Sequence, residues 1–466
     1  MPNLAEETMP VNLQRRMVLG VWAVLICFAP AWLYAAEQPN IVMIISDDQA
    51  WTDYGFMGHP QIRTPHLDRL AAESVVFKRG YVPTALCRPS LMSMITGRYA
   101  HQHGVTGNDP SPKYAKEGTE LYASQRAELI ANIDRFVTVP AALAKRGYVS
   151  HQSGKWWEGN YRRGGFTEGM TRGFPEPGGR HGDDGLTIGR QGMQPVTDFI
   201  DRAVENEKPF FVWYAPFLPH SPHNPPERLL AHYSDLGLPA TVAKYYAMCE
   251  WFDETCGELI DHLEAKGVRD NTLIVYVTDN GWIQNPESNG YAPRSKQTPY
   301  EGGVRTPIMF SWPARLKPAD RPELVTSLDL VPTMLAAAGA EIPDDLPGLN
   351  LLADLEEARP LQREEIFGEG FAHDIADIHD PEASLLYRWC IQGRWKLLLT
   401  YDGEVNRYAS SHPREEKRPQ LFDLLADPHE ETNVAGQHPE VVAELASKLA
   451  GWYDVKKRQT ITAFVD

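Results

Sequence analysis

The sequence has few cysteines and no excess of basic residues. Only five of its 466 residues are cysteine, and no two of them form a Cys-x-x-Cys pair. This excludes a disulfide-stapled scaffold and a zinc site of paired cysteines. Lys and Arg total 45 against 62 Asp and Glu, which gives a formal net charge of −17. Such a surface repels nucleic acid and anionic membranes, so we expect no nucleic acid partner, and an anionic substrate needs local cations.

The apolar stretch near the N-terminus is at or below the length of a membrane span. It covers residues 17–33, contains Pro30 and follows Arg15-Arg16, whereas a span needs about 20 apolar residues. The small residues of Tyr34-Ala35-Ala36 suit a signal peptidase. We expect residues 1–36 to be a removable signal peptide, so that the mature protein is exported to the periplasm or secreted, without stable membrane insertion. An uncleaved anchor is the alternative.

Buried strands alternate with helical patterns along most of the remaining chain. Residues 40–46, 210–215 and 272–278 are continuous apolar runs, which are typical of strands covered on both faces in a parallel sheet. Helical patterns lie between these runs, at residues 65–74, 139–146, 195–206 and 240–266. The alternation predicts an α/β class.

The pattern changes towards the C-terminus. Short strand-like pieces at residues 365–367, 389–392 and 395–401 are followed by a helical pattern over residues 439–457. We therefore expect a large domain of residues 37–354 that carries the chemistry, and a smaller C-terminal α+β subdomain of residues 355–466 built on an antiparallel sheet.

Two polar pairs follow two of the predicted strands. Asp47-Asp48 comes after the first strand, and Asp279-Asn280 comes after the strand at residues 272–278. Open α/β sheets bind ligands at the carboxyl ends of their strands, so these four side chains could meet there. Four oxygen ligands without His or Cys favour Ca²⁺ or Mg²⁺. Either pair alone is more simply a turn after a strand, and the repetition is what favours a cation.

Cys87 stands at the start of a short predicted helix. Pro89 suits the first helical turn and Gly97 suits the position just past the end, so the two residues bracket the helix. Free amide groups and the helix dipole at such a start stabilise a negative charge, either a thiolate or an oxyanion of the substrate. A single cysteine is more often part of a core, and only the bracketed position favours chemistry here.

The segment CRPSLMSMITGR, from Cys87 to Arg98, resembles the signature of the formylglycine-dependent sulfatases, which is CxPSR followed by TG. The resemblance extends over the chain through six further blocks in the family's order: Asp47-Asp48-Gln49, Gly154-Lys155-Trp156, Pro219-His220-Ser221-Pro222, Asp279-Asn280-Gly281, Lys296 with residues 300–307, and residues 421–424 with Asp427-Pro428 and Asn433. It implies the alkaline-phosphatase-like fold, with a large mixed, mostly parallel sheet flanked by helices.

The resemblance also implies a cofactor and a nucleophile. In this family the cysteine that matches Cys87 is converted to Cα-formylglycine by a formylglycine-generating or equivalent maturation enzyme, and the aldehyde hydrate is the nucleophile. A divalent cation, usually Ca²⁺ and with Mg²⁺ as the alternative, is held by the residues that match Asp47, Asp48, Cys87, Asp279 and Asn280. A cysteine that stays a thiol is expected to be nearly inactive.

Four further residues match the family's catalytic set. Lys155 and Lys296 match the sulfate-binding lysines, and His220 matches the histidine that helps to protonate the leaving oxygen. Arg98 closes the signature and is expected to order the surroundings of the nucleophile. Taken singly, such residues are more often solvated surface or ordinary loop residues, so their assignment depends on the ordered blocks.

Two positions depart from the family pattern. The family often has Arg at the position of Leu91 and His at the position of Trp157. We hypothesise that Arg88 supplies the missing cation and His181 the missing imidazole. Trp157 is also a candidate for substrate contact, together with Trp282, because indole rings stack on sugars and aryl groups.

The sequence therefore predicts a sulfatase that hydrolyses the sulfate ester of a carbohydrate or another small organic sulfate to an alcohol and inorganic sulfate. Two alternatives remain. A phosphate or phosphonate monoester hydrolase of the same fold uses similar parts, and a catalytically silent binder of sulfated glycans is suggested by Leu91 and Trp157. Turnover of a sulfate ester and of the matching phosphate ester separates the three.

Overall fold

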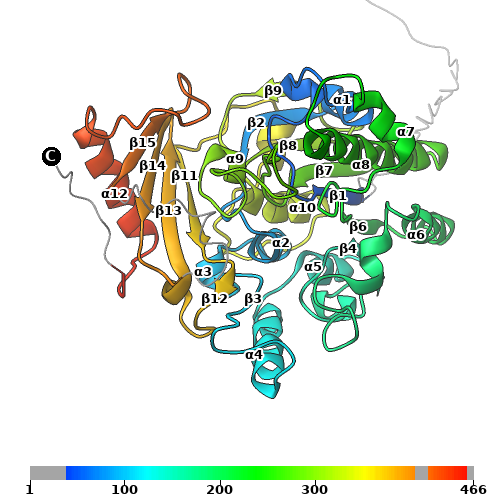
Figure 1. Ribbon diagram of the computed structural model, residues 1–466. Coiled ribbons are helices and arrows are strands. Elements are labelled where there is room, and N and C mark those ends of the chain that lie inside the picture. Colours follow the sequence, from blue (N-terminus) through cyan, green and yellow to red (C-terminus); the bar gives the residue numbers. More distant parts are fainter. Residues whose placement is uncertain (1–37, 405–417, 459–466) are drawn as a thin grey trace, which may run out of the picture. The chain divides into compact units, whose positions relative to one another are not determined.

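Two sheets organise residues 38–404 and 418–458, which the computed structural model describes. The larger sheet has nine strands in the order β10-β2-β8-β7-β1-β6-β4-β5, with β9 paired to β2 (Figure 1). Its strands are β1 Asn40–Ser46, β2 Val75–Tyr81, β4 Val149–Gly154, β5 Glu168–Gly169, β6 Phe210–Ala215, β7 Thr272–Thr278, β8 Arg305–Ser311, β9 Ala319–Arg321 and β10 Val325–Thr326.

The centre of the large sheet is parallel and buried on both faces. β1 pairs in parallel with β6 and β7, and β6 pairs in parallel with β4, while β8 is antiparallel to β7 and β2. Along β1, Ile41 and Met43 join the hydrophobic cluster on one face, and Val42 and Ile44 join the cluster on the other. This is why the apolar run of β1 is continuous rather than alternating.

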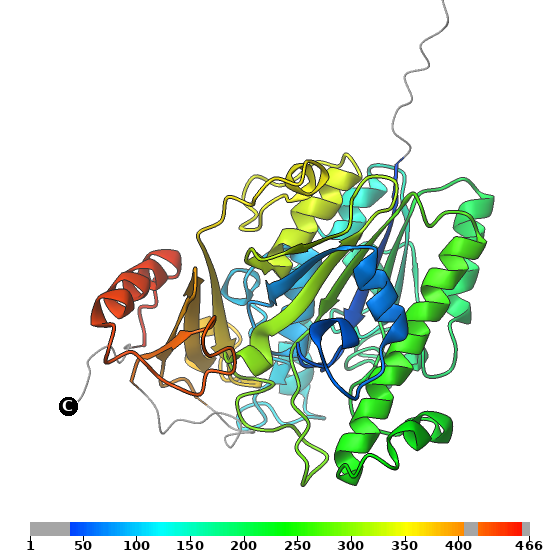
Figure 2. The same ribbon diagram turned by 90° about the horizontal axis from the view of Figure 1, so that it is seen from above.

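Helices cover both faces of the large sheet (Figure 2). One face carries α1 Pro65–Ala72, α6 Gln194–Glu205 and α8 Ala240–Ala265, and the other carries α2 Cys87–Thr96, α5 Val139–Ala144 and α10 Leu330–Ala337. The other helices of the described residues are α3 Ala100–His103, α4 Glu120–Ala131, α7 Glu227–Leu230, α9 Glu301–Val304, α11 Leu352–Glu356 and α12 Pro439–Trp452.

The smaller sheet is antiparallel throughout. Its strands are β11 Glu365–Phe371, β13 Leu385–Gln392, β14 Trp395–Thr400 and β15 Gln420–Asp423, in the order β11-β13-β14-β15. α12 covers the face that is turned away from the large sheet (Figure 1). The other face contributes Trp389, Ile391 and Leu398 to a cluster that continues under the large sheet. The predicted fold class is thus confirmed, and the domain boundary at residues 354/355 stays a prediction.

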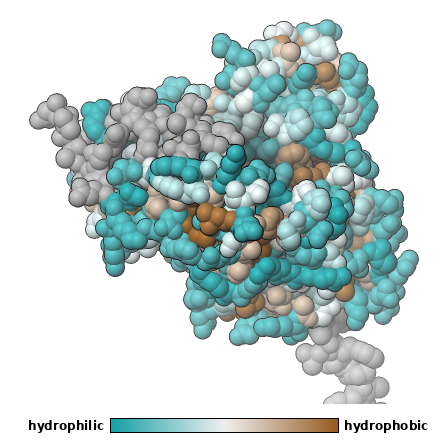
Figure 3. Space-filling model, turned by 60° about the horizontal axis from the view of Figure 1, so that its bottom comes forward, coloured by the Kyte–Doolittle hydropathy of each residue, from teal (hydrophilic) through white to brown (hydrophobic). Residues whose placement is uncertain are grey.

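A third, minimal pairing connects the two parts of the chain. β3 Asp109–Pro110 pairs in parallel with β12 Asp374–Ile375, which follows β11 of the smaller sheet. The surface in Figure 3 is mainly hydrophilic with small apolar patches. In the part of the chain that the structure describes, no helix has the length and apolar character needed to cross a membrane. The predicted signal peptide, residues 1–36, lies outside this part.

Candidate active site

Four polar side chains meet where β1 and β7 end side by side: Asp47, Asp48, Asp279 and Asn280. The carboxylate of Asp279 accepts hydrogen bonds from the backbone N–H groups of Asp48, at 3.1 Å, and Asn280, at 2.7 Å. The amide nitrogen of Asn280 donates to Oδ1 of Asp48 at 2.7 Å. All four side chains are buried, so the two strand ends hold them in one fixed cluster.

The loop after β7 also requires a glycine. A Cβ atom on Gly281 would lie 2.1 Å from the carbonyl oxygen of Gly302 in α9, so any larger residue collides with backbone. The backbone N–H of Gly281 donates to the carbonyl of Gly303 at 2.8 Å. The Asp279-Asn280 turn is therefore packed directly on α9.

Cys87 faces this cluster from the first turn of α2. Its side chain is buried, and Nζ of Lys296 lies 3.1 Å from its Sγ. The helix ends at Gly97, which has a φ of 71°, as the bracketing by Pro89 and Gly97 predicted. Burial raises the pKa of the Cys87 thiol to about 11, although Lys155 and Lys296 act in the opposite direction. An unmodified Cys87 therefore stays a neutral thiol at neutral pH.

Two buried lysines neutralise the carboxylates. Nζ of Lys296 lies 2.5 and 2.7 Å from the two carboxylate oxygens of Asp48. Nζ of Lys155 lies 2.6 Å from Oδ1 of Asp47 and 3.5 Å from Oδ2 of Asp279. Burial alone would lower the pKa of both lysines, but the neighbouring carboxylates raise it above its usual value. Both ammonium groups are therefore charged.

His220 completes the cluster from the loop after β6. Its Nδ1 donates to the carbonyl of Ser221 at 2.6 Å, and its Nε2 lies 3.3 Å from Oδ2 of Asp48. Desolvation lowers the pKa of His220 well below its usual value, although Asp48 acts in the opposite direction. In the neutral ring, the lone pair of Nε2 faces the Asp48 carboxylate, and a proton or a cation is needed between them.

The donor set fits a divalent cation. Oδ2 of Asp47 and Oδ1 of Asn280 are buried oxygens that have no hydrogen-bond partner among the described residues. Ligand atoms of Asp47, Asp48, Cys87 and His220 all lie within 4.8 Å of one another. Buried oxygens in native proteins are nearly always satisfied, and hard oxygen donors at this spacing suit Ca²⁺ or Mg²⁺.

Residues 39–340 match the family model described as Sulfatase, and residues 294–454 match the model described as N-sulphoglucosamine sulphohydrolase, C-terminal. The first match alone covers well over half of the chain. The chain belongs to the sulfatase family. Since members of this family are sulfuric ester hydrolases, the prediction of that enzyme class is confirmed.

Relatives of this sulfatase match it over nearly its whole length. Human arylsulfatase A is 28% identical, over 89% of this chain and 88% of its own length. The N-acetylgalactosamine-6-O-sulfatase of Bacteroides thetaiotaomicron is 26% identical, over 89% of this chain and 93% of its own. A structure solved in work on the metabolism of multiple glycosaminoglycans by the same organism has a TM-score of 0.71 at 23% identity, and the match covers 90% of this chain and 99% of that one.

A cavity of about 310 Å³ opens above the cluster of this sulfatase. Its wall contains the candidates Cys87, Lys155, His220 and Lys296 at one end. The rest of the wall contains Asn108, Trp157, Arg180, His181, Ser221, Trp282, Asn289, Gly290, Tyr291, Gln297 and His373. None of the described residues that line the cavity is acidic, because Lys155 and Lys296 pair with the carboxylates of the cluster.

The structure does not bring Arg98 into this site. Arg98 follows the far end of α2, about 15 Å from Cys87 along a helix of this length. Its guanidinium lies 2.6 Å from a carboxylate oxygen of Asp345 and 5.1 Å from the centre of the Phe136 ring. The expectation that Arg98 orders the surroundings of the nucleophile is therefore wrong, because nine further residues of α2 and Gly97 stand between Cys87 and Arg98.

Arg88 is also turned away from the cavity. Its Nε and Nη2 each donate to the carboxylate of Glu158 at 2.8 Å, and the whole pair is buried. Arg88 is absent from the wall of the cavity, so the hypothesis that it replaces the missing family arginine is wrong. Leu91 is buried in the hydrophobic core.

His181 and Trp157 both line the cavity. Their ring centres lie 5.4 Å apart, and the Trp157 ring also lies 5.2 Å from Nζ of Lys155. Burial and the neighbouring Arg180 lower the pKa of His181 to about 3, so its imidazole is neutral. No sequence pattern predicted Asn108, Arg180 and His373 as cavity residues, although Arg180 is adjacent to the candidate His181.

Proposed function

We propose that this sulfatase hydrolyses the sulfate ester of a sulfated carbohydrate, with Cα-formylglycine at position 87 and a bound divalent cation. The observation that carries this proposal is the position of Cys87, at the start of α2 and 3.1 Å from Lys296, which itself contacts Asp48. A raised thiol pKa makes an unmodified cysteine a poor nucleophile here, which supports conversion of the side chain.

The cation would be held by Asp47, Asp48, Asp279, Asn280 and the modified residue 87. The unpartnered oxygens of Asp47 and Asn280 support this set. When bound, the cation polarises the sulfate and offsets its charge. The hydrated aldehyde at position 87 supplies the oxygen nucleophile. Ca²⁺ is preferred because the donors are mostly carboxylate and amide oxygens.

The side chains of this chain bind the sulfate and handle the proton. Lys155 and Lys296 line the cavity as fixed ammonium groups, so they attract the sulfate into a protein with a net charge of −17. His220 presents Nε2 towards the cluster while Nδ1 is held by Ser221. In the neutral ring Nε2 is unprotonated. We propose that the bound anionic substrate favours protonation of Nε2, which Asp48 stabilises, and that His220 then donates this proton to the leaving alcohol.

The substrate class follows from the neighbours in sequence. Two of the relatives are named for sulfatase activity, and one of these names specifies a sulfated N-acetylgalactosamine. The partners are then a sulfated glycan or small sulfated sugar and a maturation enzyme that acts on Cys87. Export through residues 1–36, and the division into residues 37–354 and 355–466, remain proposals that N-terminal sequencing of the mature protein and limited proteolysis test.

The decisive experiment is mass spectrometry of the peptide that contains residue 87, from protein made in its native host. The expected mass is that of the aldehyde or its hydrate, which replaces the thiol. The same preparation should release sulfate from 4-nitrophenyl sulfate and should prefer it to 4-nitrophenyl phosphate. Cys87→Ala should lose activity, while Cys256→Ala, at another buried free thiol, should keep it.

Three results would contradict the proposal. If an active preparation contains only unmodified cysteine at position 87, formylglycine is not the nucleophile. A strong preference for the phosphate ester favours the phosphate or phosphonate monoester hydrolase. Binding of a sulfated glycan without any release of sulfate by the matured protein favours the silent binder.

A further inference from the structure

Arg180 lies in the wall of the active-site cavity but is not part of the cation cluster. It comes from the loop between β5 and the segment Asp183–Thr187, and its side chain is 39% exposed. Its Nε donates to Oδ2 of Asp109 at 2.9 Å, and its Nη2 contacts the same oxygen. The remaining N–H groups of Arg180 have no partner in the described part of the chain.

The guanidinium of Arg180 is held in place before any ligand binds. Arg126, which is buried, contacts the other oxygen of Asp109 and also donates to the carbonyl of Arg180. The backbone N–H of Trp156 donates to the carbonyl of His181 at 3.1 Å, which ties the same loop to the segment of Lys155. Arg180 therefore has a fixed position relative to Lys155, and little side-chain entropy is lost when it binds a ligand.

The carboxylate beside Arg180 pairs with two arginines. Arg126 and Arg180 share the single carboxylate of Asp109, while the nearby Arg88 is neutralised by Glu158. Lys155 and Lys296, which also line the cavity, are each paired with a carboxylate of the cation cluster. None of the described residues that line the cavity is acidic, so Arg180 presents a cation to the cavity in addition to Lys155 and Lys296.

The groups beside Arg180 are polar and suit a sugar. Nδ2 of Asn108 lies 3.3 Å from Nε2 of His373, and both side chains line the cavity. His373 in turn contacts Asp374 at 2.7 Å. His181 is neutral and offers an imidazole between Arg180 and Trp157. Hydroxyl groups of a sugar ring can pair with these residues while an anionic group reaches Arg180.

We propose that Arg180 binds a second anionic group of the substrate, a carboxylate or another sulfate, on the sugar that carries the reacting sulfate or on its neighbour. This inference rests on the proposed function. Arg180 is then a specificity-determining residue, and the preferred substrates are sulfated sugars that carry at least two negative groups. An arginine fork pairs with either group through two charge-assisted hydrogen bonds.

The test compares substrates that differ by one anionic group. The probes are N-acetylgalactosamine 6-sulfate, its 4,6-disulfate, and an unsaturated uronate disaccharide that carries the same 6-sulfate; 4-nitrophenyl sulfate reports the basic reaction. The variants are Arg180→Met and Arg180→Lys. Arg172→Met is the matched control, because Arg172 lies in the same loop, pairs with Asp184 at 3.3 Å and does not line the cavity.

Wild-type enzyme should prefer the disulfate or the uronate disaccharide to the monosulfate, and the better of the two identifies the anion. On that substrate, Arg180→Met should lower kcat/KM by about 10- to 100-fold, mainly through KM, and Arg180→Lys should lose less. On 4-nitrophenyl sulfate the same variants should change kcat/KM less than about threefold. Arg172→Met should behave as wild type on all probes.

Two outcomes overturn the inference while leaving the proposed function intact. One is an equal loss on all substrates in Arg180→Met, which indicates a structural effect. The other is an unchanged preference: Arg180→Met has the same ratio of kcat/KM between the doubly charged substrates and the monosulfate as wild-type enzyme. If wild-type enzyme with formylglycine at position 87 hydrolyses none of the sulfate esters, the proposed function fails and the inference fails with it.

Discussion

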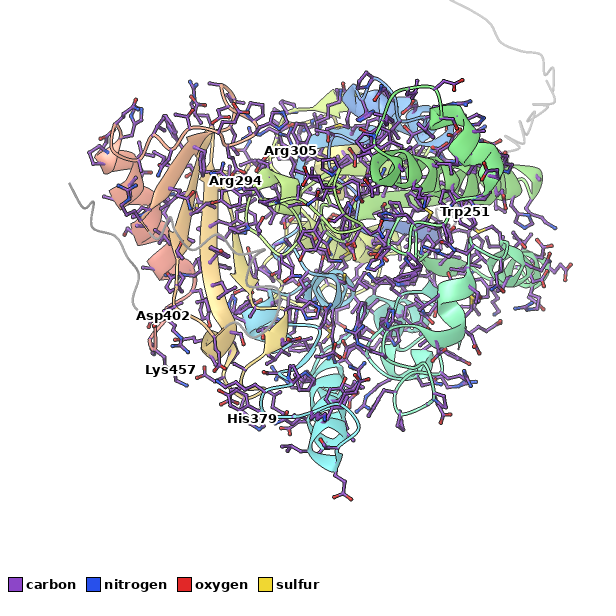
Figure 4. The ribbon with its side chains drawn as sticks, viewed as in Figure 1. Trp251, Arg294, Arg305, His379, Asp402 and Lys457 are labelled. Atoms are coloured by element: carbon purple, nitrogen blue, oxygen red, sulfur yellow. The ribbon has the colours of Figure 1, made fainter. Side chains whose placement is uncertain are left out.

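Lys396 is a buried cation that joins the smaller sheet to α9, and its replacement by methionine should destabilise the protein strongly. It lies in β14 with no exposed surface, and its Nζ is 2.9 Å from a carboxylate oxygen of Glu301 and 2.9 Å from one of Glu430. Glu301 starts α9 and also contacts Arg305, at 3.4 Å. Arg305 is labelled in Figure 4. Lys396→Met keeps the apolar length of the side chain and removes only the charge.

The expected loss of stability in Lys396→Met follows from the carboxylates of Glu301 and Glu430, which remain buried without their shared cation. Breaking a buried ion pair by removing one partner costs about 3–5 kcal/mol. With roughly 400 described residues, the entropy of unfolding is about 0.8 kcal/mol per kelvin, so Tm should fall by about 4–6 °C. Lys396→Met with Glu430→Gln should recover part of the loss, because one unpaired carboxylate is then removed as well.

The pH dependence gives the loss a second signature. Burial and the neighbouring Glu301 raise the pKa of Glu430 to about 7, although Lys396 acts against them. Without Lys396 this pKa rises further above its unfolded value. The folded state of the variant then binds a proton that the unfolded chain does not, so its stability falls as pH rises. The difference in free energy of unfolding between wild type and Lys396→Met should therefore be larger at pH 8.5 than at pH 5.5.

Thermal unfolding at both pH values measures these effects. Lys448→Met is the matched control, because Lys448 contacts Glu365 at 2.8 Å near the same sheet but is 27% exposed. An exposed pair is worth no more than about 1 kcal/mol. The reasoning is refuted if Lys396→Met melts within about 1 °C of wild type, or if its deficit is the same as that of Lys448→Met.

Three further predictions follow from other buried groups. Ca²⁺ at 100 times its Kd should raise the Tm of metal-free protein by about 3 °C, and Asp47→Asn should abolish the rise in a thermal-shift assay. Burial lowers the pKa of His151 to about 4, so the stability of its neutral form is lost as pH falls below about 6.5. Between pH 8 and pH 5, the free energy of unfolding in urea should fall by about 2 kcal/mol less in His151→Gln than in wild type. Equal decreases in the two proteins would contradict this. Trp157→Ala should lower the free energy of unfolding by about 3–5 kcal/mol and should also slow sulfate release. Trp157→Phe should keep most of the stability and most of the activity. Unchanged stability in Trp157→Ala would contradict the burial of this side chain.

Local patterns in the sequence determined three central strands of the large sheet, the helices at residues 65–74, 139–146, 195–206 and 240–266, and the polar residues that follow two of the strands. The run at residues 40–46 is apolar on both faces, so it had to be a central strand, and its polar end had to lie at the carboxyl edge of the sheet. The same reasoning applies to β7 and Asp279-Asn280. Pro89 and Gly97 likewise predicted α2 and placed Cys87 at its start, because helix ends have strong local preferences.

Only the tertiary structure decided which cations and imidazoles face the cavity. Arg88 is adjacent to Cys87 in sequence, yet Glu158 turns it away, and Arg98 points from the far end of α2 to Asp345. His373, which follows β11 of the smaller sheet, contacts Asn108 although the two residues are 265 positions apart in the sequence. Such contacts arise from the packing of distant segments, and no local periodicity encodes them. The sequence by itself determined that a polar cluster forms at the end of β1, and the packing of the loops around it decided which further groups line the cavity.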